Sequence, residues 1–200
     1  LSKPAPHVQF MSTISQVLNT EGRQRLMACT DSDEMYRALT SAPAAAPKAA
    51  PRPAKFRLAD YLETETLRPE LAARTKEEAI DELLGLLHDH GRLSDLETTR
   101  EAVLARERQM STGMEEGVAI PHGRTDAVSR LVCAVGVSRE GLEFGSADSK
   151  PTHIIVLALT PTAGADPYLQ FAAAIIHALD EEGRKRVLEA RSPEALRQAL

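Results

Sequence analysis

His122 is the residue in this chain whose setting best suits chemistry, because it stands between the rigid Pro121 and the permissive Gly123. A short apolar run, 118–120, precedes it and predicts a brief buried strand or strand end. Pro121 lacks an N–H and should interrupt the strand ladder, and Gly123 should let the backbone turn away directly after the histidine. We therefore expect His122 at the rim of a core, where a side chain can react.

The chemistry that these residues suggest is nucleophilic attack by an imidazole on an anionic electrophile. An imidazole is largely neutral at pH 7, so one ring nitrogen can attack while a hydrogen bond holds the other. Neighbouring hydroxyls and a cation suit a phosphoryl group; they belong to Ser111, Thr112, Thr125 and Arg124. From the residues alone, a plain surface histidine remains the alternative.

The elements that must position this histidine follow an α/β alternation. Thr75 and Glu78 form a capping-box pattern that opens a helix ending near Gly91. Apolar runs of strand length predict strands covered on both faces. The remaining expected elements are a helix from Ser94 or Asp95 to about Arg108, strands over 130–137 and 152–159, and helices over 167–180, over 182–190 and from Ser192. The predicted fold class is α/β, a mixed sheet with helices on both faces.

Composition narrows the function classes. The 200 residues carry a net charge of −5, which argues against nucleic acid or an anionic membrane as the main partner. Cys29 and Cys133 stand far apart in apolar-leaning contexts, so neither a disulfide framework nor a metal site is expected. No apolar run approaches the roughly twenty residues of a membrane helix, and no signal-peptide pattern opens the chain, so we expect a cytoplasmic protein without direct membrane insertion.

The residues around His122 resemble a known phosphorylation-site motif. Ser111-Thr112-Gly113, a short Gly-containing loop and Val118-Ala119-Ile120-Pro121-His122-Gly123 resemble the site of type 2 EIIA domains of the bacterial phosphoenolpyruvate:sugar phosphotransferase system (PTS), fructose/mannitol class. The resemblance extends over 56–200. It includes Gly141-Leu142-Glu143-Phe144, Asp148, Pro151, His153 and the closing helical segment.

The resemblance implies a phosphotransferase without a cofactor. His122 would receive a phosphoryl group from the phosphohistidine of the phosphocarrier HPr and hand it to a cysteine of an EIIB domain, which serves a membrane EIIC permease for fructose or a related sugar or sugar alcohol. The alternative is a regulatory module of the nitrogen-related branch, in which the phosphorylation state of His122 controls binding to other proteins.

Supporting residues follow by position. Arg106, sixteen residues before His122, matches an arginine that lies beside the active histidine in the mannitol branch; the alternative is a solvated cation at a helix end. Ser111 and Thr112 would donate to phosphoryl oxygens or cap the loop. Arg124 would meet phosphate or acidic groups of a partner.

Two departures from the family pattern stand out. Tyr168 occupies the place of a second histidine; its hydroxyl can orient a phosphoryl oxygen but cannot act as a cation. Glu115 replaces a loop glycine and brings a carboxylate near an anion site.

His153 begins an apolar strand and is expected to be a hydrogen-bonded structural residue rather than a second acceptor.

The Pro/Ala-rich stretch over 41–55 predicts a semi-extended linker between a front segment, 1–40, and one complete domain, 56–200. At a constant shift of 161 residues, Pro6-His7-Val8-Gln9-Phe10 matches Pro167-Tyr168-Leu169-Gln170-Phe171, and Glu21-Gly22-Arg23 matches Glu182-Gly183-Arg184. This register predicts that 1–40 is the C-terminal helical end of a preceding EIIA-like copy. The alternative is two unrelated amphipathic helix pairs. A multidomain polypeptide of this kind favours the transport function over the regulatory one.

Overall fold

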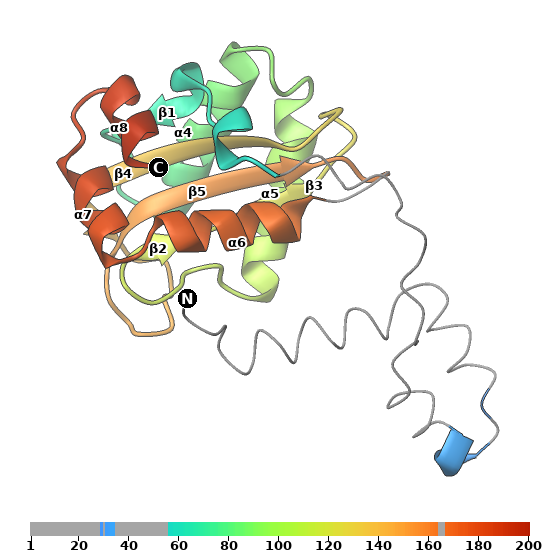
Figure 1. Ribbon diagram of the computed structural model, residues 1–200. Helices are drawn as coiled ribbons and strands as arrows, with labels where there is room; N and C mark the ends of the chain where they lie inside the picture. Colours follow the sequence, from blue (N-terminus) through green and yellow to red (C-terminus); the bar gives the residue numbers. More distant parts are fainter. Residues whose placement is uncertain (1–28, 30, 35–55, 164–166) are drawn as a thin grey trace. The chain divides into compact units, whose positions relative to one another are not determined.

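The computed structural model describes residues 29, 31–34, 56–163 and 167–200 (Figure 1). Contacts divide the chain into two units, Leu1–Pro53 and Ala54–Leu200, and the second unit contains the sheet and the histidine strand. The predicted linker lies outside the described residues, as does nearly all of the predicted front copy over 1–40. Both therefore stay predictions.

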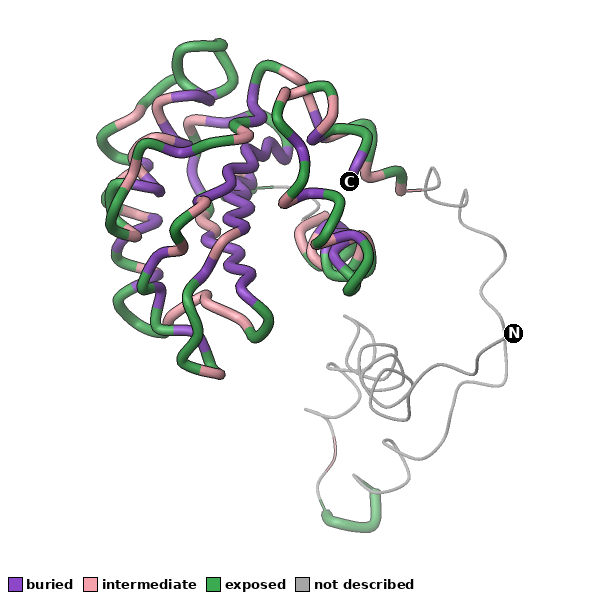
Figure 2. The backbone as a smooth tube through the Cα atoms, turned by 90° about the vertical axis from the view of Figure 1, so that its left-hand side faces the viewer, coloured by how far each residue is buried: buried purple, intermediate pink, exposed green. Residues whose placement is uncertain are grey.

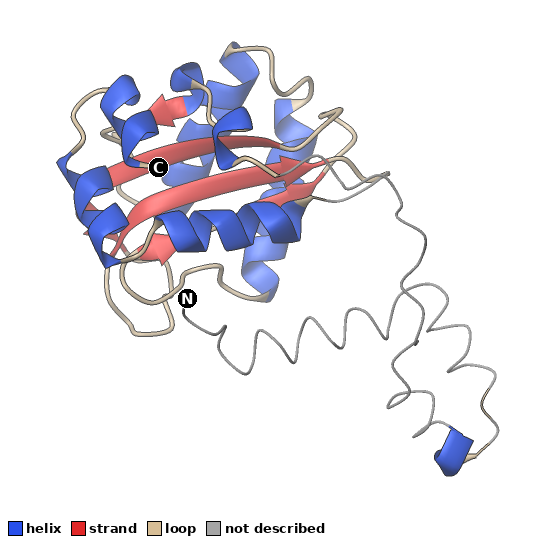
Figure 3. Ribbon diagram, viewed as in Figure 1, coloured by secondary structure: helices blue, strands red, loops and turns tan. Residues whose placement is uncertain are grey.

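A five-stranded mixed sheet forms the centre of the second unit (Figure 3). The strand order is β1-β4-β5-β2, with β3 also paired to β5. β4 and β5 run antiparallel, whereas β1 is parallel to β4, and β2 and β3 are parallel to β5. The strands are β1 Leu67–Arg68, β2 Val118–Ala119, β3 His122–Arg124, β4 Val132–Leu142 and β5 Thr152–Thr160.

Side chains of the two long strands alternate between two apolar cores, one on each face of the sheet. One core lies against α4 and α5, and the other against α6, α7 and α8. The helices are visible on the ribbon of Figure 1, and the buried central strands are purple in Figure 2. The predicted class, a mixed sheet with helices on both faces, is confirmed. The helices are α4 Lys76–Asp89, α5 Leu96–Gln109, α6 Tyr168–Ala178, α7 Glu181–Glu189 and α8 Pro193–Ala199, with 3-10 turns η1 Leu58–Asp60 and η2 Thr64–Thr66.

Local sequence signals start the helices where they were expected. The capping box of α4 forms in both directions: the Glu78 N–H donates to Thr75 Oγ1 at 3.2 Å, and the Thr75 N–H donates to Glu78 Oε2 at 3.3 Å. Side chains of Asp95, Asp180 and Ser192 cap α5, α7 and α8 in one direction only, each by accepting the N–H of the residue three positions later.

β4 continues five residues past the predicted strand end at Val137. Its register against β5 shifts between Val137 and Leu142, and Gly141 adopts a φ of +81°. The polar residues over 138–140 interrupt the apolar pattern, so hydrophobicity alone hides the second half of this strand. Within the described ranges, no helix combines the length and the apolar character that spanning a membrane requires.

Candidate active site

The segment that carries His122 is an edge strand, and this corrects one expectation. The chain does not turn away after the histidine; β3 pairs His122 with Ala158 and continues along β5 to Arg124. Pro121 does separate β2 from β3, as predicted. Gly123 serves a different purpose: a Cβ there would lie 2.9 Å from Cγ2 of Val103, so the missing side chain lets α5 pack closely against β3.

The imidazole of His122 is half-buried and held through one nitrogen. Its Nδ1 lies 3.0 Å from the carbonyl oxygen of Ile120 and 2.9 Å from the hydroxyl of Tyr168, whose ring centroid is 4.5 Å from that of the histidine. A carbonyl only accepts, so the proton belongs on Nδ1, and the Tyr168 oxygen shares it. Both hydrogen bonds that the imidazole ring makes with the described residues are at Nδ1. Nε2 therefore keeps its lone pair for attack on an electrophile.

The hydroxyls of Ser111 and Thr112 are engaged within the protein. Ser111 Oγ lies 2.5 Å from the carbonyl oxygen of Phe144 and 3.1 Å from Oε1 of Glu107. Thr112 donates its hydroxyl to Oε2 of Glu107 at 2.6 Å and its N–H to the same carboxylate at 3.1 and 3.2 Å. Of the two roles expected for these hydroxyls, these contacts serve the holding of the loop. A role toward a phosphoryl group stays a prediction.

Glu107 is a residue of the site region that sequence reasoning missed. It lies on the last turn of α5 with only 3% of its surface exposed, and Nζ of Lys76 is 3.5 Å from its Oε1. A carboxylate buried to this degree needs hydrogen-bond donors and a cation, and it has both. The available signal was its spacing: Glu107 follows the buried Val103 by four residues and therefore shares the inward face of the helix.

The two arginines expected at the site lie on different elements, Arg106 on α5 and Arg124 at the end of β3. Arg106 projects from α5, the helix behind the edge strand, and donates from Nη1 to the carbonyl oxygen of Met110 at 3.0 Å. In the described part of the chain it makes no hydrogen bond with His122, which leans toward α6 through Tyr168. Arg124 donates from Nη2 to the carbonyl oxygens of Pro161 and Thr162 at 3.3 and 2.9 Å.

The loop between Thr112 and His122 is a tight hairpin. The Met114 N–H donates to the carbonyl oxygen of Val118 at 2.8 Å, and Glu116 and Gly117 both have positive φ, +64° and +75°. The Glu116 N–H donates to Asp148 Oδ2 at 3.0 Å; this bond, followed by the one from the Lys150 N–H, holds the pKa of the Asp148 carboxyl below its usual range. Arg184 pairs with Glu116 at 2.9 Å and ties the hairpin to α7.

Exposed apolar side chains gather on the elements around His122. In the described part of the chain, the exposed large hydrophobic residues are Met110, Leu169 and Ile176, with 65%, 77% and 49% of their surface exposed. Met110 directly follows α5, and the other two lie on α6. An open hollow of about 540 Å³ lies between the hairpin and α6; its apolar lining comes from Met114, Val118, Ala147, Ile176 and Leu179.

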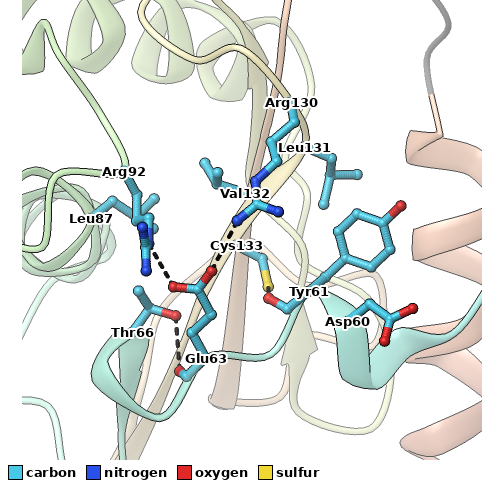
Figure 4. A pocket seen from close by; sticks show the side chains of 10 residues that line it. All are labelled: Asp60, Tyr61, Glu63, Thr66, Leu87, Arg92, Arg130, Leu131, Val132 and Cys133. Carbon is cyan, nitrogen blue, oxygen red and sulfur yellow. Dashed lines mark hydrogen bonds and ion pairs between the residues drawn. The ribbon is translucent and has the colours of Figure 1, made fainter.

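A second pocket, away from His122, is too small to matter for function. It surrounds Glu63, which pairs with Arg92 at 2.5 Å and with Arg130 at 3.2 Å (Figure 4). Its volume of about 10 Å³ approaches that of a single water molecule and leaves no room for a sugar or a phosphate. Cys133 also lines it, and burial raises the pKa of that thiol to about 12, which favours the protonated, less reactive form of Cys133 at neutral pH.

A mixed sheet with helices on both faces and a Pro-His-Gly edge strand is what the resemblance to type 2 EIIA domains implies, and comparison with known families gives the same class of protein. Residues 60–200 match the family described as "Phosphoenolpyruvate-dependent sugar phosphotransferase system, EIIA 2". The chain belongs to this family and carries its phosphoryl-transfer domain. The match does not include 1–40, so it lends no support to a second copy there, and that copy remains a prediction.

Two fructose-specific PTS proteins are among the relatives that are similar to this chain in sequence. The chain is 39% identical over 127 residues to the PTS system fructose-specific EIIA component of Haloferax volcanii, covering 63% of this chain and 82% of that protein. It is 33% identical over 142 residues to the fructose-specific EIIABC component of Bacillus subtilis, covering 70% of this chain but only 22% of that longer protein.

Solved structures share the fold. The nitrogen regulatory protein IIA-Ntr of Neisseria meningitidis aligns with a TM-score of 0.65 at 26% identity, covering 71% of this chain and 97% of that one. IIA mannitol of Escherichia coli aligns with a TM-score of 0.59 at 25% identity, covering 69% and 97%.

Proposed function

We propose that this EIIA domain accepts a phosphoryl group on Nε2 of His122 from phosphorylated HPr. It then passes the group to a cysteine of an EIIB domain, for uptake of fructose or a related sugar. The observation that carries the proposal is the fixed Nδ1–H of His122, which leaves Nε2 as the nucleophile at an edge strand.

The transfer step balances without a metal or an added proton. The Nε2 lone pair forms a bond to phosphorus while the phosphorus–nitrogen bond of the donor histidine breaks, and the donor nitrogen keeps the electron pair. The His122 ring gains positive character as the bond forms. Its Nδ1–H then becomes a stronger donor to Ile120 O and Tyr168 Oη, so both contacts strengthen in the transition state.

Several neighbours would support this step. Arg106 would swing from Met110 O to the phosphoryl oxygens, since a long exposed guanidinium side chain can exchange one weak contact for a doubly charged anion. Arg124, next to the histidine, would meet the phosphoryl group or acidic side chains of the partner. Ser111, Thr112 and Gly123 would shape the site, the first two through Glu107 and the glycine through close packing of α5.

The surface around His122 supports a protein as the donor and as the acceptor. Met110, just after α5, and Leu169, on α6, are exposed by 65% and 77%, and exposed apolar side chains of this kind are typical of a protein-docking surface. A small sugar would instead need an enclosed site with convergent polar groups. This supports HPr and EIIB as the partners, with EIIC reached only through EIIB.

Relatives support transport over regulation. The fructose-specific EIIA component of H. volcanii is 39% identical, whereas the nitrogen regulatory protein of Pseudomonas aeruginosa is 32% identical over 107 residues. The regulatory alternative rests on the structural similarity to IIA-Ntr. The two functions differ in one measurable respect, because only the transport component must hand its phosphoryl group to an EIIB cysteine.

The test is phosphorylation in a purified system. The chain is incubated with phosphoenolpyruvate, enzyme I and HPr, and its mass is compared with that of His122→Ala. We expect one acid-labile phosphoryl group on the wild type and none on the variant; phosphate persisting on the variant would rule the assignment out. Adding a fructose-type EIIB should then discharge the wild type, and failure to discharge would favour the regulatory function.

A further inference from the structure

We propose that Glu107, paired with Lys76, is a positioning residue that holds the imidazole of His122 in its reactive tautomer, through Thr112 and Ile120. This inference rests on the proposed role of His122 as the phosphoryl acceptor. Neither Glu107 nor Lys76 contacts the histidine, so the effect must pass through the backbone between them.

The first link joins α5 to the loop that begins the site. Both oxygens of the Glu107 carboxylate accept the Thr112 N–H, at 3.2 and 3.1 Å, and Oε2 also accepts the Thr112 hydroxyl at 2.6 Å. Three such contacts hold Thr112 against rotation and sliding as long as the Glu107 carboxylate keeps its place. Lys76, the first residue of α4, keeps a positive charge 3.5 Å from Oε1.

The second link joins the loop to the histidine. The carbonyl oxygen of Thr112 accepts the N–H of Ile120 at 3.2 Å, and an antiparallel bridge pairs Gly113 with Ala119 beside it. The carbonyl oxygen of Ile120 in turn accepts Nδ1–H of His122 at 3.0 Å. The peptide group of Ile120 is thus fixed from the Thr112 side and determines where the imidazole finds its acceptor.

Burial distinguishes this arrangement from an ordinary capping carboxylate. Asp95 and Asp180 cap helices from exposed positions, whereas the Glu107 side chain is 2% exposed. A buried charge needs full compensation, so the carboxylate and its donors form one geometry and tolerate no other. Removing the charge should release Thr112, let the Ile120 carbonyl move, and leave Nδ1–H without a fixed acceptor.

The experiment compares four variants of the full chain: Glu107→Gln, Thr112→Val, Thr112→Ser and Thr66→Val. Thr66→Val is the matched control, because Thr66 is also buried and donates its hydroxyl to a backbone carbonyl, that of Glu63, at 3.1 Å. Two quantities are measured: the ¹⁵N chemical shifts of the His122 ring, which report the protonated nitrogen, and the rate of phosphoryl transfer from HPr. Circular dichroism reports folding.

We expect a single Nδ1–H tautomer in the wild type, and a mixture of tautomers with transfer slowed about tenfold or more in Glu107→Gln. Thr112→Val should slow transfer about threefold to tenfold, Thr112→Ser should restore it, and Thr66→Val should change neither quantity. Unchanged tautomer and rate in a folded Glu107→Gln would overturn the inference. If Glu107→Gln does not fold, Thr112→Val decides, and an unchanged tautomer there has the same consequence. A wild type that takes no phosphoryl group defeats the proposed function instead, while the ring shifts still test the positioning.

Discussion

Two half-buried histidines of this domain, His122 and His153, make the same hydrogen bond through Nδ1 but have different surroundings. Each holds a backbone carbonyl with Nδ1 at 3.0 Å, His122 that of Ile120 and His153 that of Ser138. Each lies on a strand of the same sheet, His122 on edge strand β3 and His153 on the central β5. The shared contact fixes a tautomer and does not by itself make a site.

The surroundings separate the two rings. His153 fits between two glycines: a Cβ on Gly141 would lie 2.8 Å from its Cε1, and one on Gly117 would lie 3.4 Å from its Cδ2. The imidazole fills the space that those glycines leave. His122 instead meets the Tyr168 hydroxyl at 2.9 Å, on a strand that pairs with β5 alone among the described strands. Under the proposed function, the position of His122 on the edge strand, rather than its Nδ1 contact, distinguishes it from His153.

The largest expected contrast comes from replacing each histidine. His122→Ala should abolish phosphorylation while the domain stays folded. His153→Ala should leave phosphorylation within about twofold and lower the free energy of unfolding by about 1–3 kcal/mol, because the Ser138 carbonyl loses its donor and a gap opens. Mass spectrometry and urea unfolding measure the two effects. Phosphorylation lost in both variants would remove the distinction between the two histidines.

Removing Arg106, the cation expected beside His122, tests a second difference between His122 and His153. Arg106→Ala should slow transfer from HPr by about tenfold to a thousandfold, the scale of one lost charge-stabilising donor, with little loss of stability. Arg108→Ala is the control, since Arg108 lies exposed two residues away on the same helix. Rapid-quench kinetics with phosphorylated HPr give both rates. Equal rates for Arg106→Ala and wild type would leave Arg106 a solvated cation.

The Tyr168 hydroxyl is the contact that His153 lacks. Tyr168→Phe keeps the ring beside His122 and removes one acceptor of Nδ1–H, so transfer should slow by about threefold to tenfold. Tyr61→Phe removes a hydroxyl elsewhere in the domain and should leave the rate unchanged. A Tyr168→Phe variant as fast as the wild type would show that Ile120 alone holds the imidazole.

The smallest effect concerns Cys133, a second potential nucleophile in the same row of the sheet. Cys133 and His122 both pair with Ala158, but Cys133 lies on the central β4 and is buried. Burial raises its pKa from 9.0 to about 12. Above pH 9 the thiol ionises in the unfolded chain and not in the folded one, so stability is lost as the pH rises. Between pH 8 and 10 the wild type should lose about 1 kcal/mol more unfolding free energy than Cys133→Ala. An equal loss would mean that the thiol is not desolvated.

Much of the fold could be read from the chain because its signals act over a few residues. Thr75 with Glu78 starts α4, and Asp95 starts α5, through hydrogen bonds that span three residues. The apolar run over 152–159 became β5, covered on both faces. The same reasoning failed after Val137, where β4 continues through an irregular stretch of polar residues, 138–140, and pairs with β5 again only at Leu142. Hydrophobicity gives no signal for such a return to the sheet.

The candidate site was likewise only partly predictable from the sequence. The sequence alone showed that His122 follows a proline at the end of an apolar run, and the residues around it were enough to indicate the EIIA family. It also placed Tyr168 near the site by resemblance, 46 residues further along the chain. Local geometry after His122 was predicted wrongly, because Gly123 faces α5 and lets it approach instead of bending the strand.

Only the tertiary structure shows which nitrogen of His122 is hydrogen-bonded and which residues lie behind the site. The Tyr168 hydroxyl reaches Nδ1 only because α6 packs over the edge of the sheet, and Lys76 reaches Glu107 only because α4 lies beside α5. In the sequence, only its spacing from Val103 distinguishes Glu107 from the other charged residues near helix ends. Because Glu107 is buried, its carboxylate needs hydrogen-bond donors from the protein, and it finds them in the loop. The packing of elements distant in the sequence determines which donors lie within reach.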